Sequence, residues 1–488
     1  MAIGFQHLVP VLFILLSVAS FWSATSDSTS AIIEYLPGFE GPLPFKLETG
    51  YTEVGEDNDA QLFYYFVESQ GNPKADPIIL WLAGGPRCST FTGFIYEIGP
   101  LAFKDGYRET HMEGAVGGIR QVVSDGDVPG LQLNPYAWTQ IASIIFVDQP
   151  VGSGFSYSKA GREGEMTDTK SALDTYKFLL KWLEDHPQYR SNPLYVCGDS
   201  YSGITVPQVV QEIIRGIEAG KGPVLNFQGY TLGNPVTDRE FETNSEVPFS
   251  HRMGLISDEL YESLDKNCKG SYVNFDSSNL LCASYYKRFT KIVSGVNPYS
   301  ILEPLCSAAS KQNDSSNTRP TLESIRLRAS NCRDDGYKLS EIWANDDRVQ
   351  TALRVRKGTI TIKTWVRCNS YGNPDQVDHG VKYVMDVKSS LAYHRNISTK
   401  GYRSLIYSGD HDMRISHVST EAWIRSLNIS VVDEWRPWLV EGQVAGFTTR
   451  YANGMIYATL KGAGHITPEY QPKESYTLFK NWLLDDAL

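Results

Sequence analysis

The feature that most constrains the fold is the run Tyr195-Val-Cys-Gly-Asp-Ser-Tyr-Ser-Gly203. An apolar, strand-like lead-in ends at Gly198, and a helical pattern over residues 206–219 follows the run. Ser200 therefore lies where a strand turns abruptly into a helix. Such a turn strains the backbone of its central residue and needs small neighbours, because two chain segments cross close by. The run departs from Gly-x-Ser-x-Gly, since Ser202 stands where the second glycine is usual, so alone it indicates a catalytic serine only weakly.

Continuous apolar stretches bounded by turn residues recur along the chain and predict strands buried in a central sheet. They lie at residues 62–67, 78–82, 142–147, 404–408 and 455–460. Helical spacing of apolar residues over 172–183 and 473–484 places helices between and after them. Strands that alternate with helices predict an α/β fold with a mostly parallel central sheet covered by helices.

The stretch from about residue 240 to about residue 365 has a different character. It holds four of the seven cysteines, more charge and a weaker apolar periodicity. We interpret it as a helical cap inserted into the fold and stapled by disulfides. Within it, the Ser/Asn-rich run 307–324 predicts an exposed, protease-sensitive loop. Residues 27–488, including this cap, are predicted to form a single domain.

The amino-terminal residues and the composition indicate a compartment. A 14-residue apolar run over 8–21, followed by Ser23-Ala-Thr-Ser26, predicts a secretory signal peptide at 1–26 that is too short to span a membrane. No later segment is long and apolar enough to span a bilayer. A net charge of −11 argues against nucleic-acid partners and anionic membrane surfaces. Apolar residues make up 41% of the chain, which is typical of a packed globular protein.

An oxidising secretory lumen changes how the cysteines and asparagines are interpreted. Seven cysteines leave one over after pairing, and Cys197 is the candidate because it lies in the apolar strand before the turn. We therefore expect it to be a buried thiol. Glycosylation is predicted at the three Asn-x-Ser/Thr sites, Asn313, Asn396 and Asn428.

Two loops that follow predicted strands carry partners for a serine nucleophile. A serine hydroxyl needs a base, and that base needs an orienting carboxylate. Residues 404–408 lead into Gly409-Asp-His-Asp412, and residues 455–460 lead into Lys461-Gly-Ala-Gly-His465. The order Ser, Asp, His, each on a loop after a strand, is that of the α/β-hydrolase fold. From these residues alone, Asp410 and Asp412 are both candidates for the orienting carboxylate.

A glycine-rich cluster follows the predicted strand at 78–82. It is Trp81-Leu-Ala-Gly-Gly-Pro-Arg-Cys-Ser89. The glycine pair can present backbone N–H groups to a developing oxyanion, together with the N–H of Tyr201, which follows the serine. The alternative interpretation is a tight turn with no further role.

Seven motifs together resemble the plant serine carboxypeptidase-like family (peptidase family S10), over nearly all of the chain after the signal peptide. These motifs are Pro37-Gly-Phe-Glu-Gly-Pro-Leu-Pro-Phe45, Trp81-Leu-Ala-Gly-Gly-Pro-Arg-Cys-Ser89, Glu97-Ile-Gly-Pro100, Phe146-Val-Asp-Gln-Pro-Val-Gly-Ser-Gly-Phe-Ser-Tyr157, Gly198-Asp-Ser-Tyr-Ser-Gly203, Gly409-Asp-His-Asp412 and Gly462-Ala-Gly-His465. The resemblance implies a triad of Ser200, Asp412 and His465. It also implies that Gly85 and Tyr201 donate the oxyanion hydrogen bonds.

The same resemblance implies the disulfide pairs and the surroundings of the site. The implied pairs are Cys88 with Cys368, Cys268 with Cys282, and Cys306 with Cys332. It implies no cofactor, and no metal-ligand spacing of Cys or His occurs in the sequence. The residues that we expect around the substrate are Ala83, Gly84, Glu97, Asp199 and Arg367. The implied destination is the vacuole first and the extracellular space second.

Two departures from the peptidase pattern bear on the reaction. In the family's peptidases, an Asn in the W-L-N-G-G loop and two Glu side chains hold the substrate carboxylate. This chain keeps Glu97 but has Ala83 at the Asn position and Asp199 before the serine. The G-D-S-Y-S-G form resembles the acyltransferase branch, which takes acyl groups from 1-O-β-glucose esters in specialised metabolism and passes them to alcohols or amines. A carboxypeptidase is the alternative, and a catalytically impaired relative is a third.

Two arginines near the glycine-rich cluster add a question. The family usually has glycine where this chain has Arg87, and an arginine at a position that needs positive φ would be strained. Alternatively, Arg87 reaches into the pocket and alters the choice of acceptor. If Cys88 pairs with Cys368, Arg367 is tethered near the same loop, where it could pair with Asp199, Glu97 or an anionic acceptor. A purely structural ion pair is the other interpretation of Arg367.

Overall fold

The computed structural model describes residues 30–55, 59–104, 128–159, 165–220, 224–273, 275–276, 278–306, 332–357, 364–369 and 382–485. The predicted signal peptide, the predicted loop at 307–324 and Asn313 lie outside the described residues. Within the described part of the chain, no helix is long and apolar enough to cross a membrane.

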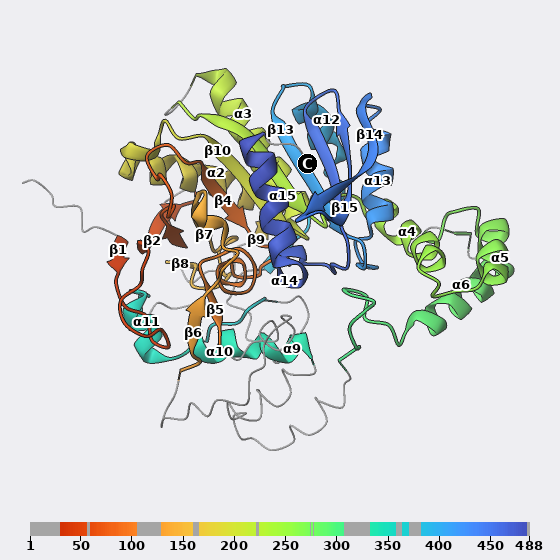
Figure 1. Cartoon of the computed structure of the whole chain (residues 1–488), viewed down its shortest axis with the longest axis horizontal. Coiled ribbons are helices and arrows are strands. Elements are labelled where there is room, and N and C mark those ends of the chain that lie inside the picture. Colours follow the sequence, from red (N-terminus) through yellow and green to blue (C-terminus); the bar gives the residue numbers. More distant parts are fainter. Residues whose placement is uncertain are drawn as a thin grey trace, which may run out of the picture.

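A twelve-stranded sheet runs through the molecule in the order β1-β2-β3-β7-β4-β10-β11-β13-β16-β15-β14, with β8 paired to β3 (Figure 1). Its strands are β1 (Ser30–Ile33), β2 (Leu47–Val54), β3 (Ala60–Val67), β4 (Ile78–Leu82), β7 (Ser143–Val147), β8 (Tyr157–Ser158), β10 (Leu194–Asp199), β11 (Phe227–Gly233), β13 (Arg403–Gly409), β14 (Val431–Val440), β15 (Gln443–Tyr451) and β16 (Met455–Leu460). Two small two-stranded sheets pair β5 (Leu101–Phe103) with β6 (Leu131–Leu133) and β9 (Glu165–Thr167) with β12 (Lys382–Val384).

The sheet is parallel only at its centre. The strands from β7 to β16 in that order pair in parallel, whereas β1 to β3 on one side and β14 and β15 on the other pair antiparallel. The α/β-hydrolase expectation is therefore confirmed, with a mixed sheet. At one edge, the turn Glu441-Gly442 has positive φ at both residues (48° and 76°), as a tight hairpin requires, so β14 and β15 are antiparallel.

Successive side chains of a strand point to opposite faces of the sheet, and the central strands are buried on both faces because an apolar core lies on each. In β4, Ile79 and Trp81 belong to one apolar core, and Ile78, Leu80 and Leu82 belong to the other. Helices complete each core. The first core is completed by α10 (Lys338–Ala344), α11 (Asp347–Ala352) and α15 (Pro472–Leu484). The second is completed by α2 (Asp168–Asp185), α3 (Ser202–Ala219), α12 (Leu391–Ser398) and α13 (His417–Ser426).

The inserted stretch consists of two parts that pack differently. After α4 (Arg239–Arg252), the helices α5 (Asp258–Cys268) and α6 (Leu280–Val293) stand out from the body with a small apolar core of their own (Figure 1). In contrast, α10 and α11, which follow α9 (Arg333–Gly336), pack on the main core through Trp343 and Val349. Part of the predicted cap is thus continuous with the main body.

Candidate active site

Five neighbouring strands deliver the candidate site to one edge of the sheet. The order β4-β10-β11-β13-β16 is continuous and parallel. Because the carboxyl ends of parallel strands meet at one edge, the loops that follow these strands converge. Those loops carry the predicted glycine-rich cluster, Ser200, Asp412 and His465, in addition to Asn234.

Ser200 occupies the turn between β10 and α3 in a left-handed conformation, with φ of 53°. Close backbone crossings explain the glycines around it. A Cβ on Gly198 would lie 2.5 Å from the carbonyl oxygen of Leu82, and a Cβ on Gly203 would lie 2.2 Å from that of Val236. Glycine is therefore required at 203, and the departure at position 202 does not disturb the turn.

His465 joins Ser200 to Asp412. Its Nε2 lies 2.8 Å from Ser200 Oγ, and its Nδ1 lies 2.7 Å from Asp412 Oδ2. A carboxylate only accepts hydrogen bonds, so Nδ1 carries the proton and Nε2 is free to accept the serine proton. Burial by itself lowers the pKa of His465, but the Asp412 carboxylate outweighs burial and raises it overall. This geometry fits a base poised beside a serine hydroxyl.

The structure distinguishes the two candidate carboxylates. Asp410 Oδ1 accepts hydrogen bonds from His411 Nδ1 and from the N–H of Gly462 (2.7 Å), so it braces the two loops against each other. Asp412 is fully buried and faces His465. The two carboxylates share a loop, and the tertiary contacts place Asp412, the residue that the resemblance implies, beside His465.

The glycine-rich loop after β4 touches the nucleophile turn. A Cβ on Gly84 would lie 2.6 Å from Ser200 Cβ, so only glycine permits this approach. The loop is anchored by the buried Asp148, whose Oδ1 accepts from Ser89 Oγ (2.7 Å) and from the N–H of Thr90 (2.8 Å). Gly85 and Tyr201, the implied oxyanion donors, directly follow Gly84 and Ser200 in the chain.

Glu97 and Asp199 form a buried acidic pair close to this site. Glu97 ends the short helix Gly93–Glu97, and Asp199 ends β10; both are buried. Burial, followed by the nearby Asp199, raises the pKa of Glu97 well above its usual value. Burial also raises the pKa of Asp199 to about 6, although His465 opposes the shift. At mildly acidic pH these carboxyls therefore hold protons.

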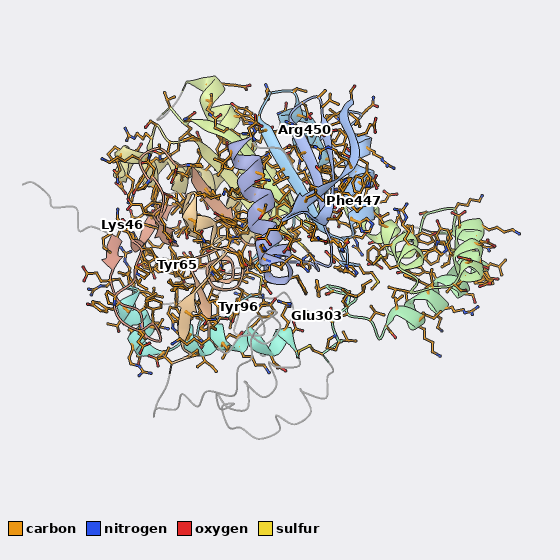
Figure 2. All side chains as sticks on the ribbon, viewed as in Figure 1. Lys46, Tyr65, Tyr96, Glu303, Phe447 and Arg450 are labelled. Atoms are coloured by element: carbon orange, nitrogen blue, oxygen red, sulfur yellow. A yellow bond between two sulfur atoms is a disulfide. The ribbon has the colours of Figure 1, made fainter. Side chains whose placement is uncertain are left out.

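The helix that carries Glu97 is tied to the inserted stretch by its neighbour Tyr96, which is labelled in Figure 2. The Tyr96 hydroxyl donates to the carbonyl oxygen of Gly336 (3.0 Å) and accepts from the N–H of Ser340 (3.2 Å). Residues of α9 and α10 thus help to place the acidic pair.

The remaining predicted residues lie around the same loop. Ala83 is buried directly after β4. Arg87 is buried with φ of 70°, so this position does require the left-handed backbone that glycine adopts without strain. Arg367 places its guanidinium 3.9 Å above the ring of Tyr337. Among the described residues, no carboxylate lies within ion-pair distance of it, so neither of the alternatives considered for this guanidinium, a pair with Asp199 or with Glu97, is formed.

Three disulfides are present, and they join the same cysteines that the resemblance implies: Cys88–Cys368, Cys268–Cys282 and Cys306–Cys332. The first tethers the glycine-rich loop to the end of the inserted stretch. Cys197 is a buried free thiol, and burial raises its pKa. The predicted sites Asn396 and Asn428 lie at exposed positions.

Sequence analysis missed several residues that the fold brings to the site. Asn234 directly follows β11, and its amide Nδ2 lies 2.8 Å from Asp412 Oδ2. Its position at the carboxyl end of a strand was the available signal. Tyr299 places its ring 5.2 Å from that of His465 and accepts a hydrogen bond from the His465 N–H (2.7 Å). It comes from the inserted stretch, and no local pattern distinguishes it.

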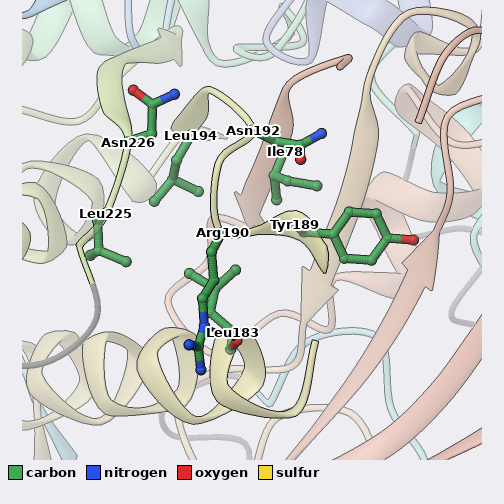
Figure 3. Close-up of a pocket in the computed structure, with 8 residues that line it drawn as sticks. All are labelled: Ile78, Leu183, Tyr189, Arg190, Asn192, Leu194, Leu225 and Asn226. Atoms are coloured by element: carbon green, nitrogen blue, oxygen red, sulfur yellow. Dashed lines mark hydrogen bonds between the residues drawn. The ribbon is translucent and has the colours of Figure 1, made fainter. Parts of the chain in front are cut away.

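A small pocket elsewhere has no part in this site. It is lined by the first residues of β4 and β10, Ile78 and Leu194, together with residues such as Tyr189 and Asn192 (Figure 3). It therefore lies at the amino ends of the strands, opposite the edge that carries Ser200. Among the described residues, Cys306, Cys332 and Asp334 lie close enough together to suggest a metal site. The two cysteines are joined in a disulfide, so their sulfur atoms are not thiolate ligands.

Comparisons with known proteins agree with this fold and site. Residues 37–485 match the serine carboxypeptidase family model of S10 peptidases. Serine carboxypeptidase-like 13 of Arabidopsis thaliana is 47% identical over 96% of this chain and 97% of its own length. Serine carboxypeptidase-like 17 of the same plant is 46% identical over 95% of this chain and 94% of its own length.

One solved structure extends the likeness to the fold. A prohormone-processing carboxypeptidase from Saccharomyces cerevisiae superposes with a TM-score of 0.66 at 17% identity, covering 93% of this chain and 95% of its own. This likeness shows the fold, and the family rests on the family match and the two plant relatives. The chain belongs to the serine carboxypeptidase-like family of S10 peptidases.

Proposed function

We propose that this protein is a serine-dependent acyltransferase that moves an acyl group from a 1-O-β-acylglucose donor to an alcohol or amine acceptor. Ser200 is the nucleophile, His465 the base and Asp412 the orienting carboxylate. The N–H groups of Gly85 and Tyr201 donate hydrogen bonds to the oxyanion that forms on the substrate. The hydrogen bonds that join Ser200, His465 and Asp412 support the nucleophilic step. The resemblance to the acyltransferase branch supports a 1-O-β-glucose ester as the donor.

The first half-reaction forms an acyl-enzyme. Ser200 Oγ attacks the ester carbonyl while His465 Nε2 takes the hydroxyl proton, and Asp412 stabilises the resulting imidazolium. The bond to the glucose oxygen then breaks, and His465 returns the proton to that oxygen. Glucose leaves, and the acyl group remains on Ser200.

The second half-reaction runs the same steps with the acceptor. An acceptor hydroxyl or amine attacks the acyl-serine while His465 takes its proton. The Ser200–acyl bond breaks, and the proton passes to Ser200 Oγ. The product is a new ester or amide, and the enzyme is regenerated without any cofactor.

The observation that carries this choice is the identity of the residues near Ser200. Ala83 provides no amide where the family's peptidases have Asn, and Asp199 has a shorter side chain than Glu. A peptide carboxylate would therefore be buried near Glu97 and Asp199 without that donor, which is costly. An acylglucose has no charge and avoids this cost.

A carboxypeptidase remains the second candidate because of one specific observation. The pKa values of Glu97 and Asp199 are raised by burial, so both can be protonated at acidic pH and donate hydrogen bonds to a peptide carboxylate. A catalytically impaired relative is the third candidate, and the strained Arg87 next to the glycine-rich loop is its support.

A side-by-side turnover assay on the purified full-length glycoprotein tests the proposal. One arm supplies hydroxycinnamoyl, benzoyl and aliphatic 1-O-glucose esters with mixed alcohol and amine acceptors. The other arm supplies blocked dipeptides at acidic pH. We expect glucose release coupled to a new ester or amide, and no transfer by Ser200→Ala. Release of amino acids alone would make the protein a carboxypeptidase.

A reciprocal variant tests the reason for the choice. Ala83→Asn combined with Asp199→Glu restores the amide and the longer acid of the peptidases. We expect this double variant to gain peptidase activity, because the peptide carboxylate regains its donors. An unchanged peptidase rate in this folded variant would remove the main support for the proposed reaction.

The domain and localisation predictions belong to the same proposal. We expect a mature chain of residues 27–488 that forms one α/β-hydrolase domain, with a cap insertion at about 240–365 and a loop at about 307–324. Entry into the secretory pathway, with the vacuole as first destination and the extracellular space as second, accords with the three disulfides. Mass mapping would show a new amino terminus near residue 27 and glycans at the three predicted sites.

A further inference from the structure

One buried side chain bridges two loops of the candidate site. Asn234 follows β11 and is fully buried with φ of 39°. Its Nδ2 donates to Asp412 Oδ2 (2.8 Å), and its Oδ1 accepts from the N–H of Gly409 (3.0 Å). Both polar ends of the amide are thus occupied by the loop that follows β13.

The backbone around Asn234 holds the nucleophile turn. The N–H of Ser200 donates to the carbonyl oxygen of Gly233 (2.9 Å), and the N–H of Val236 donates to that of Ser200 (2.8 Å). The N–H of Asn234 itself donates to the carbonyl oxygen of Tyr407 in β13 (2.8 Å). Residues 233–236 therefore contact the serine turn and the acid loop at once.

We infer that Asn234 is a positioning residue that fixes the Asp412 carboxylate relative to Ser200 and shares the charge on Asp412 Oδ2 with His465. The inference rests on the proposed nucleophilic role of Ser200. Asn234 does not touch the reacting atoms; it acts through Asp412.

The hydrogen bonds of Asp412 show why this amide matters for the base. Oδ1 accepts the N–H groups of Arg414 (2.8 Å) and Ile415 (3.1 Å). Oδ2 accepts Nδ2 of Asn234 and Nδ1 of His465. The Asn234 amide therefore competes with His465 for the charge on one oxygen. Without this amide, more negative potential reaches Nδ1, and the pKa of His465 rises further.

A substitution at Asn234 removes none of the other charged and titratable groups around the pair. His465 is also influenced by Asp199, which raises its pKa, and by Arg414, which lowers it. On the neighbouring elements, Asp412 acts on His417 and Tyr470. A shift in the pKa of His465 in Asn234→Gly therefore reports on the loss of the amide, whereas Asn234→Asp adds the effect of a new acid.

Two substitutions separate positioning from simple structural support. Asn234→Gly removes the amide and keeps the left-handed backbone. Asn234→Asp keeps the shape but replaces the donor with an acid beside Asp412. The control is Asn134→Gly, which removes a buried asparagine directly after β6, outside the loops that hold Ser200, Asp412 and His465. Its Nδ2 donates to Gly99 O (2.8 Å), and its Oδ1 accepts the N–H of Tyr136 (3.1 Å).

The experiment measures how fast a fluorophosphonate probe labels Ser200 in the full-length protein, from acidic to neutral pH. The probe reports on the serine and its base and needs neither an acyl donor nor an acceptor. We expect Asn234→Gly to slow labelling about tenfold at the plateau. We also expect the acidic limb of the profile to move upward by roughly half a pH unit, and further for Asn234→Asp. The control should keep the wild-type limb.

The outcomes are distinguishable. A slower plateau with an unchanged acidic limb in both Asn234 variants would overturn the inference, because a merely structural role lowers the rate without moving the pKa of His465. If Asn234→Gly does not fold, the Asn234→Asp profile decides, since its shape is conserved. Wild-type protein that is not labelled at Ser200 would refute the proposed function, and the inference would fall with it.

Discussion

At the scale of single residues, Gly84 gives the sharpest test of how closely the glycine-rich loop approaches the nucleophile. In Gly84→Ala the new Cβ would lie 2.6 Å from Ser200 Cβ, so one of the two segments must move. We expect fluorophosphonate labelling of Ser200 to fall about a hundredfold, because small displacements of reacting atoms are costly. Gly295→Ala is the control, since a Cβ there meets nothing within 4 Å. Labelling of Gly84→Ala at the wild-type rate would contradict the close approach.

Arg87 offers a test of stored backbone strain. Its φ of 70° is unfavourable for any residue with a Cβ. Arg87→Ala loses the side chain and keeps the strain, whereas Arg87→Gly loses both. We therefore expect the glycine variant to be more stable than the alanine variant by about 1 kcal/mol, measured by chemical denaturation. Equal stabilities would mean that the left-handed backbone stores no strain there.

At the scale of elements, the three disulfides have separable effects. Cys88–Cys368 tethers the glycine-rich loop, whereas Cys268–Cys282 lies within the outlying α5–α6 pair. Replacing either pair with serine should lower the free energy of unfolding by about 2–5 kcal/mol. Only the loss of Cys88–Cys368 should also slow labelling of Ser200 in the folded protein. Equal labelling in both variants would show that the loop is held without this bond.

The regular elements near the site followed from sequence patterns, and their ends did not. The predicted strands at 78–82 and 455–460 agree with β4 and β16. The helix predicted over 172–183 begins earlier, at Asp168, because the Thr167 side chain accepts the N–H of Lys170 (3.2 Å) and caps it. The hairpin β14–β15 was missed, since its edge strand lacks a regular alternation of apolar and polar residues, contains Pro437 and has many exposed positions.

At the scale of the whole molecule, the buried acids make stability depend on pH. The pKa of Asp199 is about 6 in the folded protein against 3.8 for an ordinary Asp, so the folded state keeps a proton that the unfolded chain releases. Its contribution to stability is thus present below 3.8 and lost as pH rises through about 6. We expect the free energy of unfolding of the wild type, relative to Asp199→Asn, to fall across that window.

Thermal or chemical unfolding of both proteins at several pH values measures this difference. The pKa of His394 is lowered to about 3 by burial and acts in the opposite sense, but it does so in both proteins and cancels. Thr290→Ala, at an exposed side chain that carries no ionisable group, is the control and should give a difference that does not vary with pH. A flat difference for Asp199→Asn as well would refute the raised pKa.

The sequence by itself determined the fold class, the order of the central strands along the chain and the loops that hold Ser200 and His465. These follow from local causes: apolar runs buried on both faces and glycines at forced crossings. Only the tertiary structure showed which of Asp410 and Asp412 faces His465, brought Asn234 to Asp412 and Tyr299 to His465, and turned the Arg367 guanidinium onto Tyr337. Those choices depend on which loops meet at one edge of the sheet, and contacts between residues far apart in the chain leave no local pattern.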